Sequence, residues 1–189
     1  MNLQGNGWCG WPAPGGGSGL THYEQWVNPY DFGFSPTLDV WKQQQYYTWV
    51  LNGDRNTIFL NPDGLINASF FIHSQADFAD LEPEVLLYWQ EQRGSHGNNY
   101  GFRAGLCFYE NKQTMDLTPN LAAAVTLDGS AADDDIIITD LTTNLDLQYK
   151  PNPLTANPLY CHLWIERDND AASGEAIIYG AKVRYKVSI

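Results

Sequence analysis

Basic residues are scarce in this sequence, and their scarcity argues against two classes of partner. Ten Lys and Arg stand against 22 Asp and Glu in 189 residues, which gives a formal charge of −12 at pH 7. A surface of that sign repels phosphate backbones and anionic lipids, so we expect neither nucleic acid nor a membrane as partner. The chain also lacks an apolar run near the ~20 residues of a bilayer-spanning helix, and its first residues lack the features of a secretory signal.

Cysteine and histidine are too few and too scattered to predict a metal site. Cys9, Cys107 and Cys161 are too few for a disulfide framework and have no zinc-type spacing. We predict free thiols, with a bridge between Cys107 and Cys161 as the alternative. No ligand spacing relates the four histidines, which are His22, His73, His96 and His162. We predict no metal and no cofactor, and we expect His162, beside Trp164 on the polar face of a strand, at the surface or in an interface.

The acidic clusters are better explained by turns and solvent than by a site. Asp133–Asp135 and Asp168–Asp170 could offer oxygens to calcium, but Asp and Asn also cap turns through their own backbone, and we assign no ligand there. Glu82, Glu84 and Glu91 lie near aromatic residues, as paired carboxylates do in glycosidases. We expect Glu82 and Glu84, which precede a strand, to be solvated loop residues, so we predict no catalytic residue and a protein that is not an enzyme.

A sustained helical period is missing as well, and short alternating segments take its place. In residues 158–168 one face carries Leu159, Cys161, Leu163 and Ile165, and the other carries Tyr160, His162, Trp164 and Glu166. In residues 175–189 the apolar set Ala181, Val183, Tyr185 and Val187 alternates with Lys182, Arg184 and Lys186. This alternation predicts two antiparallel strands, each with one solvated face.

Seven to nine short strands of this kind, separated by turn signals, predict an all-β fold. We expect a jelly-roll-like antiparallel β-sandwich with an extended N-terminal arm. The predicted divisions are a glycine-rich arm (1–20), an attachment segment (21–56) and the sandwich domain (57–189). Within them, β-branched and aromatic residues favour a strand over a helix in 40–50, and 119–125 is a short helix or a long connection.

Six short motifs follow one another at characteristic spacings over residues 65–189. They are Ala68-Ser-Phe-Phe-Ile, Leu86-Leu-Tyr-Trp89, Phe102-Arg-Ala-Gly-Leu, Asp133-Asp-Asp-Ile, Leu163-Trp-Ile-Glu-Arg-Asp168 and Tyr179-Gly-Ala-Lys-Val-Arg-Tyr185. In this order the segment resembles β-sandwich proteins of tailed-phage virions, of the head-fibre, capsid-decoration or tail-knob type. The resemblance implies a non-enzymatic structural protein located in a virion. It also implies a homotrimer and contacts with the major capsid protein or other virion proteins, made through the N-terminal arm.

Aromatic residues are abundant, with 7 Trp, 11 Tyr and 8 Phe. Trp and Tyr dominate protein interfaces and also stack on sugar rings. We expect capsid or inter-subunit contact first, local core packing second and a glycan platform third. The predicted contact residues are Trp8, Trp11, Trp26 and Trp41. The alternative function is a carbohydrate- or receptor-binding module, for which a host-surface glycan would contact Trp89, Arg93 and Tyr100 in an exposed groove.

Overall fold

Alternating apolar and polar residues build twelve strands in the part of the chain that the structure describes, and these strands form two facing sheets. The computed structural model describes residues 21–34, 47–52, 55–60, 62, 64–73, 75–76, 80–91, 99–109, 125–128, 136–148, 160–167 and 175–187. Sheet A contains β1 (Thr21–Val27), β3 (Tyr47–Asn52), β4 (Arg55–Leu60), β6 (Glu84–Glu91), β9 (Ile137–Asp140) and β12 (Ala176–Val187). Sheet B contains β2 (Phe32–Phe34), β5 (Leu65–Phe71), β7 (Asn99–Tyr109), β8 (Val125–Asp128), β10 (Asp146–Gln148) and β11 (Tyr160–Arg167).

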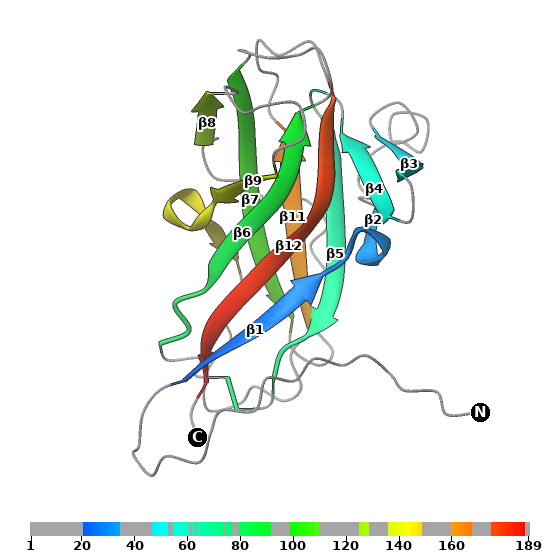
Figure 1. Cartoon of the computed structure of the whole chain (residues 1–189). Coiled ribbons are helices and arrows are strands. Elements are labelled where there is room, and N and C mark those ends of the chain that lie inside the picture. Colours follow the sequence, from blue (N-terminus) through cyan, green and yellow to red (C-terminus); the bar gives the residue numbers. More distant parts are fainter. Residues whose placement is uncertain are drawn as a thin grey trace, which may run out of the picture.

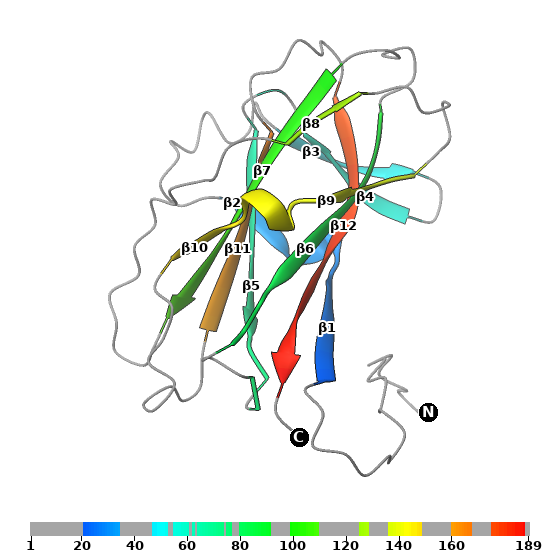
Figure 2. The same ribbon diagram turned by 90° about the vertical axis from the view of Figure 1, so that its left-hand side faces the viewer.

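The strand order is that of a jelly roll. Sheet A runs β3-β4-β12-β6-β9, with β1 also pairing with β12, and sheet B runs β10-β7-β11-β5-β2, with β8 also pairing with β7. The chain passes from one sheet to the other between β4 and β5, β5 and β6, and β6 and β7, and again between β8 and β9 and between β11 and β12. Figure 2 shows the two layers side by side. The predicted jelly-roll-like sandwich is confirmed, and only the β10–β7 pair is parallel among the described pairings.

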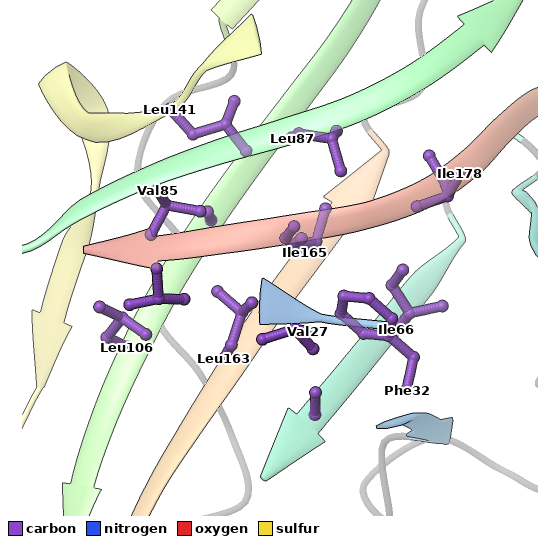
Figure 3. Close-up of a cluster of buried hydrophobic side chains, with 14 of the residues drawn as sticks. Val27, Phe32, Ile66, Val85, Leu87, Leu106, Leu141, Leu163, Ile165 and Ile178 are labelled. Atoms are coloured by element: carbon purple, nitrogen blue, oxygen red, sulfur yellow. The ribbon is translucent and has the colours of Figure 1, made fainter. Parts of the chain in front are cut away.

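The last two strands of the chain occupy the centres of the two sheets and supply much of the core. Leu163 and Ile165 of β11 belong to the same buried cluster as Val183 and Ile178 of β12, and all four are at most 1% exposed. Figure 3 shows Leu163 and Ile165 among the buried side chains between the layers. The inward sets predicted for residues 158–168 and 175–189 are therefore confirmed for the described residues. Burial of this apolar surface is the main force that holds the sheets together.

The first described residues belong to the sandwich. Thr21–Val27 pairs with β12 along its whole length, and Phe32–Phe34 pairs with β5. Between them the 3-10 helix η1 (Pro29–Asp31) carries the chain from sheet A to sheet B, and the Asn28 N–H donates to Asp31 Oδ2 at 2.9 Å. The predicted division at residue 57 therefore does not coincide with an edge of the sandwich. The predicted arm (1–20) lies outside the described residues.

Other predicted elements are confirmed in part. β3 begins at Tyr47, within the segment 40–50 where we predicted a strand, and β8 begins at Val125, the last residue of the segment 119–125 predicted as a short helix or a long connection. A second 3-10 helix, η2 (Thr142–Asn144), leads from β9 in sheet A to β10 in sheet B. Both Asp-rich stretches weighed for calcium lie outside the described residues.

The two cysteines of sheet B are free and buried. Cys161 lies in the core cluster between the sheets. Cys107 stands between Leu106 and Phe108 on β7, and both of these neighbours belong to the core cluster, so alternation turns the Cys107 side chain to the opposite face of the sheet. The bridge that we considered between these two cysteines is not formed, and the prediction of free thiols is confirmed for this pair.

Candidate functional site on the outer face of sheet A

A row of apolar side chains crosses the outer face of sheet A, and we call it the aromatic row: Trp26 of β1, Tyr88 of β6 and Ile138 of β9. Tyr88 is the register partner of Ile138 on one side and of Gly180 in β12 on the other. Trp26 reaches across Gly180 to Tyr88, and the two ring centroids are 4.7 Å apart at an interplanar angle of 67°. The row thus joins side chains from three separate parts of the sequence across strands that lie side by side in Figure 1.

Gly180 makes room for the Trp26 ring. Its φ is +141°, a conformation that residues with a side chain rarely adopt, and the register between β12 and β6 shifts at this point. A Cβ atom at this position would lie 2.7 Å from the Val27 carbonyl oxygen and 2.9 Å from Cζ2 of Trp26. Only glycine therefore lets β1 and the indole approach β12 so closely. Gly180 therefore allows both the bulge in β12 and the close packing of the Trp26 ring against that strand.

The row remains open to solvent. Trp26 is 41% exposed and Ile138 is 57% exposed, and Ile136, which directly precedes β9, is 46% exposed. These are large apolar groups, and side chains of this kind gathered on one face commonly mark a contact surface. Trp26 is one of the four predicted contact residues, and its exposure agrees with that prediction. The other three, Trp8, Trp11 and Trp41, lie outside the described residues.

Paired charges border the aromatic row along β12. Lys182 Nζ lies 3.3 Å from Glu24 Oε2, and Arg184 Nη1 lies 3.3 Å from Glu84 Oε2. Further along the strand, Lys186 Nζ lies 2.9 Å from an oxygen of Asp80 and 2.7 Å from one of Glu82. The hydrogen bonds that Lys186 donates to Glu82 and, to a smaller extent, to Asp80 raise the Lys186 pKa. Solvent screens surface pairs of this kind, so they add little to stability and their main effect is to neutralise the cations of β12.

On the other side of the row the polar groups also have partners within the chain. The Tyr179 hydroxyl donates to Gln90 Oε1 at 2.5 Å, which joins β12 to β6. The aromatic row therefore lies between a hydrogen-bonded pair and a line of ion pairs. Its own surface is apolar and uncharged.

The predicted glycan contacts by Trp89 and Tyr100 are wrong, because both side chains are fully buried. The Trp89 indole N–H donates to Thr139 Oγ1 at 2.8 Å, and the Trp89 and Tyr100 ring centroids are 4.8 Å apart inside the sandwich. The guanidinium of the buried Arg167 lies 4.6 Å from the Tyr100 ring centroid. Alternation along β6 puts Trp89 in phase with buried neighbours and exposes Tyr88 in its place. Arg93, the third predicted contact, lies outside the described residues.

The carboxylates that we weighed for catalysis do not converge. Glu82 pairs with Lys186 and Glu84 pairs with Arg184, whereas Glu91 is buried. Within the described ranges no group of three or more His, Cys, Asp or Glu side chains could hold a metal ion. No helix in the same residues is long and apolar enough to cross a bilayer.

The outer face of sheet B differs sharply from that of sheet A. His162, expected at a surface or interface, is 6% exposed, and the neighbouring Trp164 is fully buried, so a solvated position for this face of β11 is wrong. Ser69 Oγ lies 3.3 Å from His162 Nδ1, the His162 and Trp164 rings stack with centroids 6.0 Å apart, and burial lowers the His162 pKa. Trp164 Nε1 and the Asn67 side-chain nitrogen have no hydrogen-bond acceptor among the described residues.

Comparison with known proteins adds little to this geometry. No protein-family model matches the chain, and a search of the curated proteins gives no match. Among solved structures the chain is similar to TmCBM61 in complex with beta-1,4-galactotriose, with 7% sequence identity, a TM-score of 0.30, and coverage of 89% of this chain and 88% of that chain. A likeness this distant carries no argument about function.

Proposed function

We propose that this protein is a non-enzymatic structural protein of a phage virion and that it contacts a neighbouring virion protein through the aromatic row on sheet A. The observation that carries the contact surface is the joint exposure of Trp26 and Ile138 beside Tyr88. The virion assignment is supported by the ordered motifs of residues 65–189. The described parts of those motifs lie on strands β5, β6, β7, β11 and β12, with Ile72 directly after β5 and Ile136 directly before β9.

The chemistry of the row favours a protein as its occupant. Ile136 and Ile138 offer no hydrogen bond and no ring face, whereas the apolar centre of a protein interface readily buries such side chains. Trp26 and Tyr88 meet edge to face at 67°, so they do not form the coplanar platform that a glycan chain would stack upon. The polar groups beside the row already bond within the chain, as the Tyr179–Gln90 and Lys182–Glu24 pairs illustrate.

A virion role also suits the charge of the chain. With a net charge of −12, the protein is repelled by packaged nucleic acid and by other acidic copies, so specific contacts must come from apolar or basic surfaces of the partner. The major capsid protein or another virion protein is the proposed partner, and a homotrimer is the proposed assembly. In that arrangement the sandwich would hold its row against the partner and project the rest of its acidic surface outward.

The test is incorporation into particles. A phage that encodes this chain is grown with the wild-type sequence, with Trp26→Ala and with Phe71→Ala, which removes another exposed aromatic ring from sheet B. Mass spectrometry of purified particles measures the number of copies per particle. We expect the wild type and Phe71→Ala to be incorporated alike and Trp26→Ala to be lost. Absence of the wild-type chain from particles would remove the virion role, and normal incorporation of Trp26→Ala would remove the row as the contact.

Carbohydrate or receptor binding is the second candidate, and one observation favours it. Trp26 is a half-exposed indole held in place by Gly180 and Tyr88, which would let a single sugar ring stack without further ordering of the side chain. A glycan array probed with the full chain, with Trp26→Ala as the matched variant, tests this function. Binding that disappears in the variant would favour it, and an array with no signal would leave the protein contact alone.

A further inference from the structure

We propose that the partner of the aromatic row adds a strand to the edge of sheet A at β9, and that this strand is an extended segment with an apolar and a basic side chain two residues apart, on the same face. The inference rests on the proposed contact surface and specifies how the partner is held. It concerns the backbone of β9 as well as its side chains. A partner bound in this way would continue both the hydrogen-bonded ladder and the apolar surface of the sheet.

The backbone of β9 faces an edge. Among the described strands β9 pairs only with β6, and it ends the strand order of sheet A. The Leu141 N–H donates to the Val85 carbonyl at 2.9 Å, so the residues in phase with Leu141 bond toward β6. In an antiparallel ladder the alternate residues turn their N–H and C=O groups the other way, and here these are Ile138 and Asp140. An edge of this kind is a template for another strand.

The side chains at this edge continue the aromatic row. Ile138 stands next to Tyr88 in the register and is 57% exposed, and Ile136 is 46% exposed. A strand added beside β9 would lie about 4.8 Å away, and every second side chain would fall on the same outer face. An apolar side chain at such a position would pack against Ile138 and lengthen the row by one strand.

Charge selects the kind of strand that fits. Asp140 is exposed on β9, shares the outer face of the strand with Ile138, and accepts the Thr142 N–H through Oδ1 at 2.9 Å. The cations on the outer face of β12 are already paired with Glu24, Glu84, Asp80 and Glu82. A lysine or arginine of the added strand that lies beside Asp140 would therefore meet its carboxylate, while an apolar residue two positions away packs against Ile138. A second copy of β9 would bring carboxylates of its own toward this edge, so the occupant we propose is a different protein.

The experiment uses the full chain and, as the probe, a synthetic peptide in which valine and lysine take turns at every second position with threonine between them, so that both lie on one face of the extended peptide. Titration calorimetry at low and at moderate salt measures its affinity. The first control is the same peptide with N-methyl groups on alternate backbone nitrogens, which keeps charge and side chains but removes the donors to an edge strand. We expect the methylated peptide to bind about tenfold more weakly or worse, because strand addition depends on those main-chain hydrogen bonds.

The second control alters β9 of the protein in place of the peptide. Ile138→Pro removes one N–H from the open side of β9, a position at which edge strands tolerate proline, and Phe71→Ala is the control on sheet B. We expect peptide binding to fall about tenfold in Ile138→Pro and to stay unchanged in Phe71→Ala. Urea unfolding checks that both variants fold, and the methylated peptide keeps the test decisive if Ile138→Pro does not.

Two results would overturn strand addition at β9. Equal affinity of the plain and methylated peptides would mean that charge alone attracts the probe, and no heat of binding at low salt would mean that the edge takes no basic strand. Self-association of the wild-type chain that Ile138→Pro abolishes would assign the edge to a second copy instead. These outcomes do not depend on the particle experiment. If strand addition fails but Trp26→Ala is still not incorporated into particles, the proposed virion function stands and only the added strand is rejected.

Discussion

The outer faces of the two sheets follow the same strand alternation but reach opposite environments. On sheet A the outward residues Trp26 and Ile138 are 41% and 57% exposed, whereas on sheet B the outward residues His162 and Trp164 are 6% and 0% exposed. Alternation thus identifies which side chains leave the core, but it does not determine whether they meet solvent. The outer face of sheet A therefore offers the candidate contact surface, whereas the buried His162 and Trp164 of β11 contribute to stability; Phe71, at the end of β5, is the exposed exception on sheet B.

The largest expected effect contrasts one tryptophan from each face. Trp164→Ala should lower the free energy of unfolding by about 3–5 kcal/mol, because it removes a fully buried ring, whereas Trp26→Ala should cost about 1 kcal/mol. Urea unfolding followed by circular dichroism measures both. Trp89→Ala, which empties a buried site inside the sandwich, serves as a reference for a large loss. Equal small losses for Trp164→Ala and Trp26→Ala would erase the contrast between the faces.

A smaller loss is expected where the aromatic row crosses β12. Gly180→Ala should destabilise the protein by about 1–3 kcal/mol, because alanine is strained at φ +141° and its Cβ meets Val27 O and Trp26 Cζ2. The double variant with Trp26→Ala should recover only part of the loss, since the contact with the Val27 carbonyl remains at 2.7 Å. Urea unfolding of the wild type, the two single variants and the double variant completes a double-mutant cycle. Full recovery in the double variant would make the indole, and not the backbone, the reason for glycine.

Acid should lower the free energy of unfolding partly through His162, which is buried on the outer face of sheet B. Burial lowers the His162 pKa in the folded state, so below about pH 6.5 the unfolded chain binds more protons at this residue than the folded chain does. Its contribution to stability is therefore present above that pH and is lost as the pH falls through the unfolded value toward the folded one. Wild type and His162→Gln are unfolded in urea at several pH values between about 7.5 and 5.5. The wild type should lose more stability than the variant, and parallel curves would contradict a buried neutral imidazole.

The smallest expected effect is that of a reductant. In a Cys9→Ser background, dithiothreitol should leave the urea midpoint unchanged, because Cys161 lies in the core and Cys107 faces the other side of sheet B. A thiol titration in urea should then find both thiols free. A midpoint that falls on reduction would mean that the two cysteines form a bond and that the register of β7 and β11 is different.

The fold was largely predictable because its central strands carry clear alternation. Residues of β11 and β12 separate into apolar and polar sets in the sequence itself, and both inward sets lie in the core. The same rule applied to β6 would have placed Trp89 inside with Leu87, in phase with it, and Tyr88 outside. The glycan prediction failed because it grouped aromatic residues by nearness in sequence and ignored their phase.

The candidate site was only partly predictable. Trp26 was named as a contact residue, but its neighbours Tyr88 and Ile138 come from distant strands, and no local pattern reveals which strands become adjacent. Gly180 gave the only local signal, a glycine inside an alternating strand, which often marks a bulge or a close approach. The burial of His162 and Trp164 was not predictable from alternation, since their positions match those of solvated residues on other strands.

Hydroxyl-radical footprinting read by mass spectrometry tests the central claim most directly, on the free chain and on the chain within purified particles. In the free chain, Trp26 and Ile138 should be oxidised readily, whereas Trp89 and Trp164 should be protected. In particles, Trp26, Tyr88 and Ile138 should become protected together while Phe71 stays reactive. Unchanged oxidation of Trp26 in particles, with protection elsewhere on the sandwich, would contradict the outer face of sheet A as the contact surface.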